Sequence, residues 1–84
     1  MISNHFYWDG IRYDVIRYDI QPDVRMQPRP IGYRLLEAED PQGWRCYGWV
    51  SPSGVSRIGY TSLEAARQGS WRDHNCAVRL GIPT

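Results

Sequence analysis

Residues 11–20 read Ile-Arg-Tyr-Asp-Val-Ile-Arg-Tyr-Asp-Ile, a five-residue unit that occurs twice in succession directly after Asp9-Gly10. Side chains on a β-strand alternate between the two faces of a sheet, so an odd period sends the second copy to the opposite face. A β-bulge at the junction of Val15 and Ile16 would return the second copy to the first face and increase the local twist. The stretch therefore predicts either a strand that is buried on both faces or a bulged strand that bends.

The residues on either side of this stretch predict a hairpin followed by an irregular connection. Asp9-Gly10 supplies the positive φ angles of a type I′ turn, and the aromatic run Phe6-Tyr7-Trp8 precedes it as the first strand. Residues 21–30 contain three prolines and little apolar content, which is typical of a partly polyproline-like connection.

Two turn signals divide the next part of the chain into three predicted strands. Asp40-Pro41-Gln42-Gly43 has proline at the second turn position and glycine at the fourth, and Pro52-Ser53-Gly54 turns the chain again. Their regular short spacing predicts an antiparallel meander. The strands are expected to run from about Ile31 to Glu37, from Trp44 to Val50 and from Val55 to Tyr60.

A C-terminal helix is predicted by the signals at its two ends. Thr61 is the expected N-cap, with Glu64 completing a capping box, and Gly81 after Arg79 is the expected left-handed C′ residue. Gly69 leaves open a kink or break within the helix. The stripe that recurs at helical spacing, and that we expect to face inward, is Leu63, Ala66, Ser70, His74, Ala77 and Val78.

These elements predict a single α+β domain over residues 1–84. We expect an antiparallel sheet of about five strands, built from an N-terminal hairpin (1–20) and a three-stranded meander (31–60). The proline-rich connection (21–30) joins them, and one C-terminal helix (61–81) crosses one face of the sheet.

The charge balance and hydropathy of the chain limit the kinds of partner that it is expected to bind. The chain has ten basic and nine acidic residues, whereas a dedicated nucleic-acid binder usually has a clear basic excess. All ten basic residues are arginine, which fits either the codon usage of the host or selection for guanidinium groups at an interface. No apolar run approaches the roughly 18 residues of a membrane span, and the N-terminus lacks a secretory pattern. We therefore expect a cytoplasmic protein with no membrane partner.

The sequence lacks the motifs of enzyme chemistry. It contains no nucleophile elbow, phosphate-binding loop or dinucleotide-binding fingerprint. Cys46, Cys76, His5 and His74 are enough ligands for a four-coordinate zinc site. The Cys-x₂-Cys spacing that identifies such sites is absent, so we reject this interpretation. Cys76 and His74 are two positions apart on the predicted helix, where side chains point apart. We expect no enzyme, no catalytic residue, no cofactor and no metal.

Alternation along the strand 44–50 separates two sets of side chains. Cys46 and Gly48 lie on one face, where small residues suit close packing beneath the helix, and Arg45, Tyr47 and Trp49 lie on the other. We therefore expect the second face to be exposed, unless Tyr47 and Trp49 pack against the N-terminal hairpin. Arginine and aromatic residues are enriched in binding hot spots. The predicted partner-binding residues are Tyr33, Arg45, Tyr47, Trp49 and Arg57.

Part of the chain resembles a family of DNA-binding domains. The resemblance rests on Trp49-Val50, Gly59-Tyr60-Thr61 and Glu64-Ala65-Ala66, within a stretch from Tyr33 to about Leu80. This stretch is similar to the three strands and helix of plant ethylene-response-type domains and their phage-associated relatives. In that family, Arg and Trp on the sheet enter the major groove. The resemblance implies DNA contacts at Arg45, Trp49 and Arg57.

A second resemblance is one of type. A short chain with a hairpin, a meander and one capped helix is similar to small phage- or plasmid-encoded inhibitors of bacterial defence, including anti-CRISPR proteins. Such inhibitors share little sequence, so this resemblance assigns no residue. It implies occupation of a protein surface or a nucleic-acid channel without catalysis.

We therefore expect a non-enzymatic interaction module with a macromolecular partner, first of all a protein such as a host or defence complex that it inhibits. A DNA-binding module that uses the sheet is the first alternative. The second is a structural or assembly subunit that forms homo-oligomers through a sheet edge.

Overall fold

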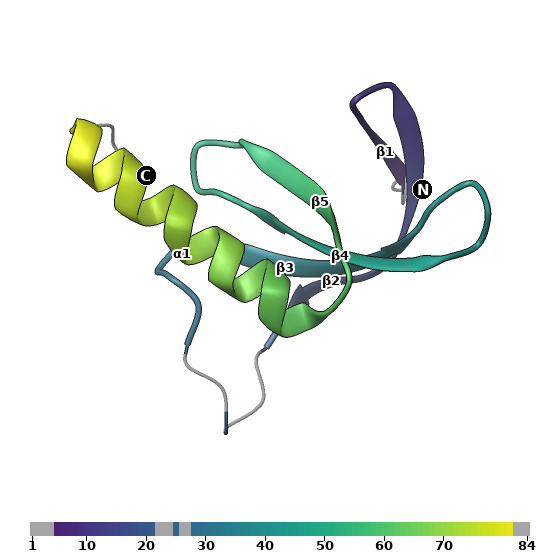
Figure 1. Cartoon of the computed structure of the whole chain (residues 1–84), viewed down its shortest axis with the longest axis horizontal. Coiled ribbons are helices and arrows are strands. Elements are labelled where there is room, and N and C mark those ends of the chain that lie inside the picture. The colour runs from purple at the N-terminus through teal and green to yellow at the C-terminus, as the bar shows by residue number, and fades with distance from the viewer. Residues whose placement is uncertain (1–4, 22–24, 26–27, 82–84) are drawn as a thin grey trace.

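Five antiparallel strands and one C-terminal helix make up the part of the chain that the structure describes, residues 5–21, 25 and 28–81 of a computed structural model (Figure 1). The predicted α+β architecture is confirmed. Half of the predicted proline-rich connection, residues 22–24 and 26–27, lies outside the described residues. The elements are β1 (His5–Trp8), β2 (Ile11–Ile20), β3 (Arg34–Glu39), β4 (Arg45–Val50), β5 (Ser56–Tyr60) and α1 (Leu63–Leu80).

The strands form one meander in the order β1-β2-β3-β4-β5, and each strand pairs antiparallel with its neighbour in the chain. The sheet curls strongly, so that β1 and β5, at the two ends of the strand order, rise on the same side of it (Figure 1). The result is a nearly closed, barrel-like sheet with α1 on its outside.

The N-terminal hairpin forms as its turn residues predict. Asp9 and Gly10 have φ angles of 53° and 77°, both in the left-handed region that a type I′ turn requires. Trp8 and Ile11 pair directly on either side of the turn.

Of the two arrangements expected for residues 11–20, a strand buried on both faces or a bulged strand, the structure shows the bulged strand. Val15 pairs with Ala38 and Arg17 with Glu37, which leaves Ile16 without a partner in the ladder. Tyr18 therefore returns to the face that carries Tyr13, although the two residues are five positions apart. A second register shift follows at Asp19, whose φ is 58°, and it moves Ile20 to the opposite face.

The two faces of the sheet bury separate cores. The inner core lies in the curl of the barrel, and Trp8 and Val50 pack at its margin. The outer core lies between the sheet and α1. The inner core consists of Tyr13, Leu36, Ala38, Cys46 and Ile58, and the outer core of Tyr33, Leu35, Trp49 and Ala66.

The helix covers the face of β4 that was expected to be exposed. Trp49 packs beneath Ala66, whereas Cys46 and Gly48 belong to the buried inner side. The predicted arrangement is wrong because the small residues lie on the inner, concave face, where the strands of the curled sheet pack against one another. On the convex face the large ring comes from the sheet and the small residue from the helix.

The helix begins one residue later than predicted. Ser62, not Thr61, is the N-cap: its φ of −148° is extended, and its hydroxyl accepts a hydrogen bond of 3.1 Å from the backbone N–H of Ala65. The C-terminal prediction is confirmed, because Gly81 has a φ of 74° and its N–H bonds the carbonyls of Ala77 and Val78. Within the described residues, no helix is long and apolar enough to cross a membrane.

The helix is continuous through Gly69, which has a packing role. Gly69 is buried, and a Cβ atom at this position would collide with the ring and hydroxyl of Tyr60. The predicted inward stripe holds at Ala66 and Ser70 but fails at Val78, which is 61% exposed.

Replacing the N-cap should weaken the helix start. We expect Ser62→Ala to lower the free energy of unfolding by about 1 kcal/mol, because the N–H of Ala65 loses its acceptor. Thr61→Ala is the matched control and should change it by less than about 0.5 kcal/mol. Thermal melts of both variants show which residue is the N-cap. A larger loss of stability for Thr61→Ala than for Ser62→Ala would contradict the observed helix start.

Gly69→Ala should destabilise the protein, even though alanine is favoured over glycine in a helix by about 1 kcal/mol. The added methyl group would push α1 away from Tyr60, and overpacking of this kind typically costs about 1–3 kcal/mol. Gln68→Ala, at the exposed neighbouring position, is the control. A melt in which Gly69→Ala is more stable than wild type would show that the helix does not approach Tyr60 so closely.

Candidate functional site

The predicted partner-binding residues do not form one exposed surface. Tyr33 and Trp49 are only 1% and 4% exposed, because α1 lies over both, and their predicted exposure is wrong. Tyr47 is half-buried, while Arg45 and Arg57 are exposed. The alternative, that Tyr47 and Trp49 pack against the N-terminal hairpin, holds in part: Ile20 at the end of β2 packs against their core, which the helix also covers.

Tyr33 fastens the helix to the sheet. Its hydroxyl donates a hydrogen bond of 2.6 Å to the Asp73 carboxylate, and its ring lies 5.8 Å from that of Trp49 and 6.0 Å from that of His74. Burial, followed by the bond to Asp73, raises the pKa of Tyr33 well above its ordinary value. The phenol therefore stays protonated and serves the packing of α1.

Arg45 and Tyr47 converge on a buried carboxylate, Glu37, which is 5% exposed. Arg17 Nε donates to Glu37 Oε1 at 2.9 Å. Arg45 Nη1 and the Tyr47 hydroxyl donate to Oε2 at 3.3 and 3.1 Å. Arg45 also lies 3.5 Å from a carboxylate oxygen of Glu39. The charge of Glu37 is thus fully partnered, which a buried carboxylate requires.

These contacts fix the protonation states of the cluster. Burial alone would raise the pKa of Glu37, but the hydrogen bonds from Arg17, Tyr47 and Arg45 outweigh it and hold the pKa below the usual range. The bond to Glu37 raises the pKa of Tyr47. At neutral pH the carboxylate is ionised and the phenol protonated, an arrangement that joins β2, β3 and β4.

The two cysteines lie on opposite sides of the sheet. Cys46 is in the inner core, where its Sγ donates to the Ala38 carbonyl at 3.5 Å and burial raises the pKa of the thiol. Cys76 is exposed on α1. A nucleophilic cysteine needs a lowered pKa, so the surroundings of Cys46 suit packing instead.

A bulge in β5 brings an arginine and a tyrosine together at the surface. Tyr60 pairs with Tyr47 and Ile58 with Gly48, which leaves Gly59 unpaired with a φ of 110°. Arg57 and Tyr60 are three residues apart and would point to opposite sides of a regular strand. The bulge brings them to one side, where the Arg57 guanidinium lies 5.9 Å from the centroid of the Tyr60 ring.

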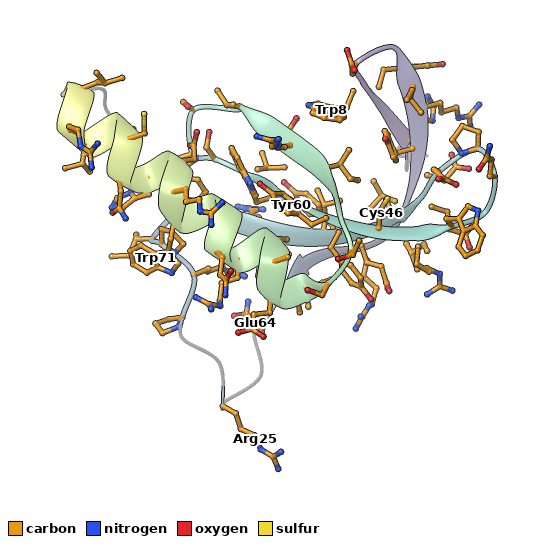
Figure 2. The ribbon with its side chains drawn as sticks, in the orientation of Figure 1. Trp8, Arg25, Cys46, Tyr60, Glu64 and Trp71 are labelled. Atoms are coloured by element: carbon orange, nitrogen blue, oxygen red, sulfur yellow. The ribbon has the colours of Figure 1, made fainter. Side chains whose placement is uncertain are left out.

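Trp8 completes this site from the other end of the sheet. Between β1 and β5 lies an open hollow of about 260 Å³, hereafter the β1–β5 hollow, and Figure 2 shows Trp8 between the first hairpin and β5. Trp49 Nε1 donates to the Tyr60 hydroxyl at 3.1 Å and holds that ring in place. The hollow is lined by Trp8, Arg57, Ile58, Gly59 and Tyr60.

Sequence reasoning placed Arg57 in the site but missed Trp8 and Tyr60. One local signal was present, because a glycine inside a predicted strand often marks a bulge. Gly59 could therefore have indicated that Arg57 and Tyr60 share a side. No local signal places Trp8 beside them.

No family model, curated protein or solved structure matches the chain. The resemblances to ethylene-response-type domains and to small anti-defence proteins therefore stay predictions. The function has to be argued from the residues of the site itself.

Glu37 predicts a specific dependence of stability on pH. Its folded-state pKa is lowered, so the stability it contributes is present above its unfolded pKa of about 4.3 and is lost as the pH falls through the folded value. Glu37→Gln should lower the free energy of unfolding by about 1–3 kcal/mol at neutral pH, and the difference from wild type should shrink in acid.

Denaturant titrations from neutral pH to about pH 3 measure this difference across the relevant range. Asp14→Asn, at an exposed carboxylate whose ion-pair partner Arg12 is also exposed, is the control and should follow wild type closely. An effect of Glu37→Gln that stays constant over the whole range would refute a lowered pKa at this site.

Proposed function

We propose that this chain is a small non-enzymatic interaction module that binds a macromolecular partner, in the first place a protein, at the β1–β5 hollow. The observation that carries the proposal is that Trp8, Arg57 and Tyr60 all line one open hollow, Trp8 from the side of the inner core and Arg57 and Tyr60 from the opposite face of β5. Tryptophan, tyrosine and arginine are the residue types enriched at binding hot spots, because each combines a large contact area with a polar group.

Three other chemically distinctive groups support a non-catalytic role, since each of them has a partner within the fold. Glu37 is neutralised by arginines, Tyr33 is bonded to Asp73, and Cys46 is a buried, protonated thiol. Perturbed ionisable groups can mark active sites, but buried ion-pair and packing networks perturb them as well.

The DNA-binding alternative loses the surface that the resemblance implied. Trp49 lies beneath α1, and Arg45 is engaged by Glu37 and Glu39. What favours a polyanionic partner is a set of arginines without a carboxylate partner among the described residues. They are Arg34, Arg57, Arg72 and Arg79. A partner that is itself acidic accounts for these arginines equally well.

Two narrower expectations stay predictions. Inhibition of a bacterial defence complex would be one use of a surface-binding module of this size. Assembly into homo-oligomers would use the outer edges of β1 and β5, each of which pairs with one strand only.

Substitutions in the hollow should abolish capture of the partner. The immobilised protein is incubated with a lysate of the cells in which it occurs, and bound proteins are compared between variants. We expect Arg57→Ala and Trp8→Leu each to reduce capture at least about tenfold, as loss of a hot-spot side chain does. Size-exclusion chromatography of the free protein reports homo-oligomers in the same experiment.

The chain contains matched controls for both substitutions. Arg79→Ala removes a charge in the last helical turn, and Trp44→Leu removes a tryptophan that is 69% exposed. Both should leave capture within about twofold of wild type, since most surface contacts contribute little. If the controls and the hollow variants lose the partner equally, the hollow is not the binding site.

A further inference from the structure

Arg57 is the exposed cation of the β1–β5 hollow, and a stacking contact places its guanidinium. It has no carboxylate partner among the described residues, in contrast to Arg17 and Arg45, which Glu37 occupies. Its guanidinium lies over the ring of Tyr60, 5.9 Å from the centroid. An exposed arginine side chain otherwise samples many rotamers, so this contact determines where its donors point.

The position of Tyr60 is itself determined by contacts on the outer face of the sheet. Trp49 Nε1 donates a hydrogen bond of 3.1 Å to the Tyr60 hydroxyl. In addition, the hydroxyl and ring lie so close to Gly69 of α1 that a Cβ atom there would collide with them. A ring that is held in this way offers the Arg57 guanidinium a fixed surface.

Trp49 lies on the same face of the sheet as Arg57 and Tyr60, but a partner cannot reach it. In the ladder it pairs directly with Arg57, and its indole extends diagonally to Tyr60, which pairs with Tyr47. Its side chain is 4% exposed and packs beneath Ala66 of α1. Trp49 can therefore influence binding only through the residues that it contacts.

The hydrogen bond restrains Tyr60 because its donor is buried. The indole N–H is the only polar group of a tryptophan side chain, and it can only donate. Among the described residues, the Tyr60 hydroxyl is its acceptor. A movement of Tyr60 away from Trp49 would leave this donor buried and unpaired, which is unfavourable. The ring is therefore held where the indole reaches it.

We infer that Trp49 is a positioning residue for the hollow, because it holds the Arg57 guanidinium, through Tyr60, in the orientation in which a partner meets it. This inference rests on the proposed function and extends it to a buried residue that does not line the hollow itself. Placement of the Arg57 side chain in the free protein reduces the ordering that binding requires. It also links α1 to the hollow, since Gly69 of the helix packs against Tyr60.

Ring-current shifts of arginine side-chain protons test this arrangement in the free protein. Protons that lie over an aromatic ring resonate upfield. The Hδ signals of Arg57 should therefore lie upfield of those of Arg72, an exposed arginine that lies over no ring among the described residues. Arg34 lies over Tyr18 at 5.8 Å on the opposite face of the sheet and provides a second stacked arginine in the same spectrum.

Two conservative variants remove the hydrogen bond and keep an aromatic ring at each position. Trp49→Phe deletes the indole N–H, and Tyr60→Phe deletes its acceptor. Each should move the Arg57 signals toward those of Arg72 and leave the Arg34 signals in place. The double variant should move them no further than either single variant, because the same hydrogen bond is lost.

Tyr33→Phe is the matched control for a general loosening of the outer core. It removes a hydroxyl that bonds Asp73 at 2.6 Å in the same core, but the hydrogen bond between Trp49 and Tyr60 remains. The Arg57 signals should not move in this variant. Amide spectra show that each variant is folded. Movement of the Arg57 signals in the control, or none in Trp49→Phe and Tyr60→Phe, would overturn the inference.

Capture by the immobilised variants separates this inference from the proposed function, with the protein that wild type captures as the probe. Trp49→Phe should lower capture about threefold, the effect of a stacking contact at an exposed site, and Tyr33→Phe should lower it less than about twofold. If Arg57→Ala captures as well as wild type, the proposed function fails and the inference with it. If Arg57→Ala loses capture and Trp49→Phe does not, the inference alone is wrong.

Discussion

One sheet has to bury a core on each of its faces, and the bulges in β2 and β5 make this compatible with the sequence. The bulge at Ile16 brings Tyr18 back to the inner face, and the shift at Asp19 sends Ile20 to the outer core beneath α1. The bulge at Gly59 leaves Ile58 in the inner core and turns Arg57 and Tyr60 together to the other side. Bulges also sharpen strand twist, which helps the sheet to curl. The hollow between β1 and β5 follows from this curl.

The features that the sequence could predict are those that depend on neighbouring residues. Asp9-Gly10 determines its turn, Gly81 ends the helix, and the odd period of residues 11–20 reduces β2 to two arrangements, of which the bulged strand is the one observed. The face of β4 that the helix covers depends on the curl of the whole sheet. The prediction therefore places the small residues Cys46 and Gly48 beneath the helix, whereas they lie on the inner face of the sheet. The predicted N-cap is wrong by one position because Thr61 and Ser62 are both good capping residues. Only the backbone geometry selects Ser62.

The candidate site was predictable in residue type and only partly in position. Of the five residues that arginine and aromatic enrichment singled out, Arg57 lines the candidate site. The sequence could not show that Trp49 is buried. The same local sequence is compatible with a tryptophan that packs against a helix and with one that is exposed to a partner. Trp8 joins Arg57 only because the first and last strands approach one another, and no local pattern encodes that approach.

The four tryptophans allow a direct test of whether the partner occupies the hollow. Fluorine NMR of protein labelled with fluorotryptophan is recorded with a soluble paramagnetic agent, alone and with the captured partner. Trp8 and the exposed Trp44 should both be broadened in the free protein, and the buried Trp49 should not. Addition of the partner should protect Trp8 and leave Trp44 broadened. Protection of Trp44 with no change at Trp8 would contradict the account.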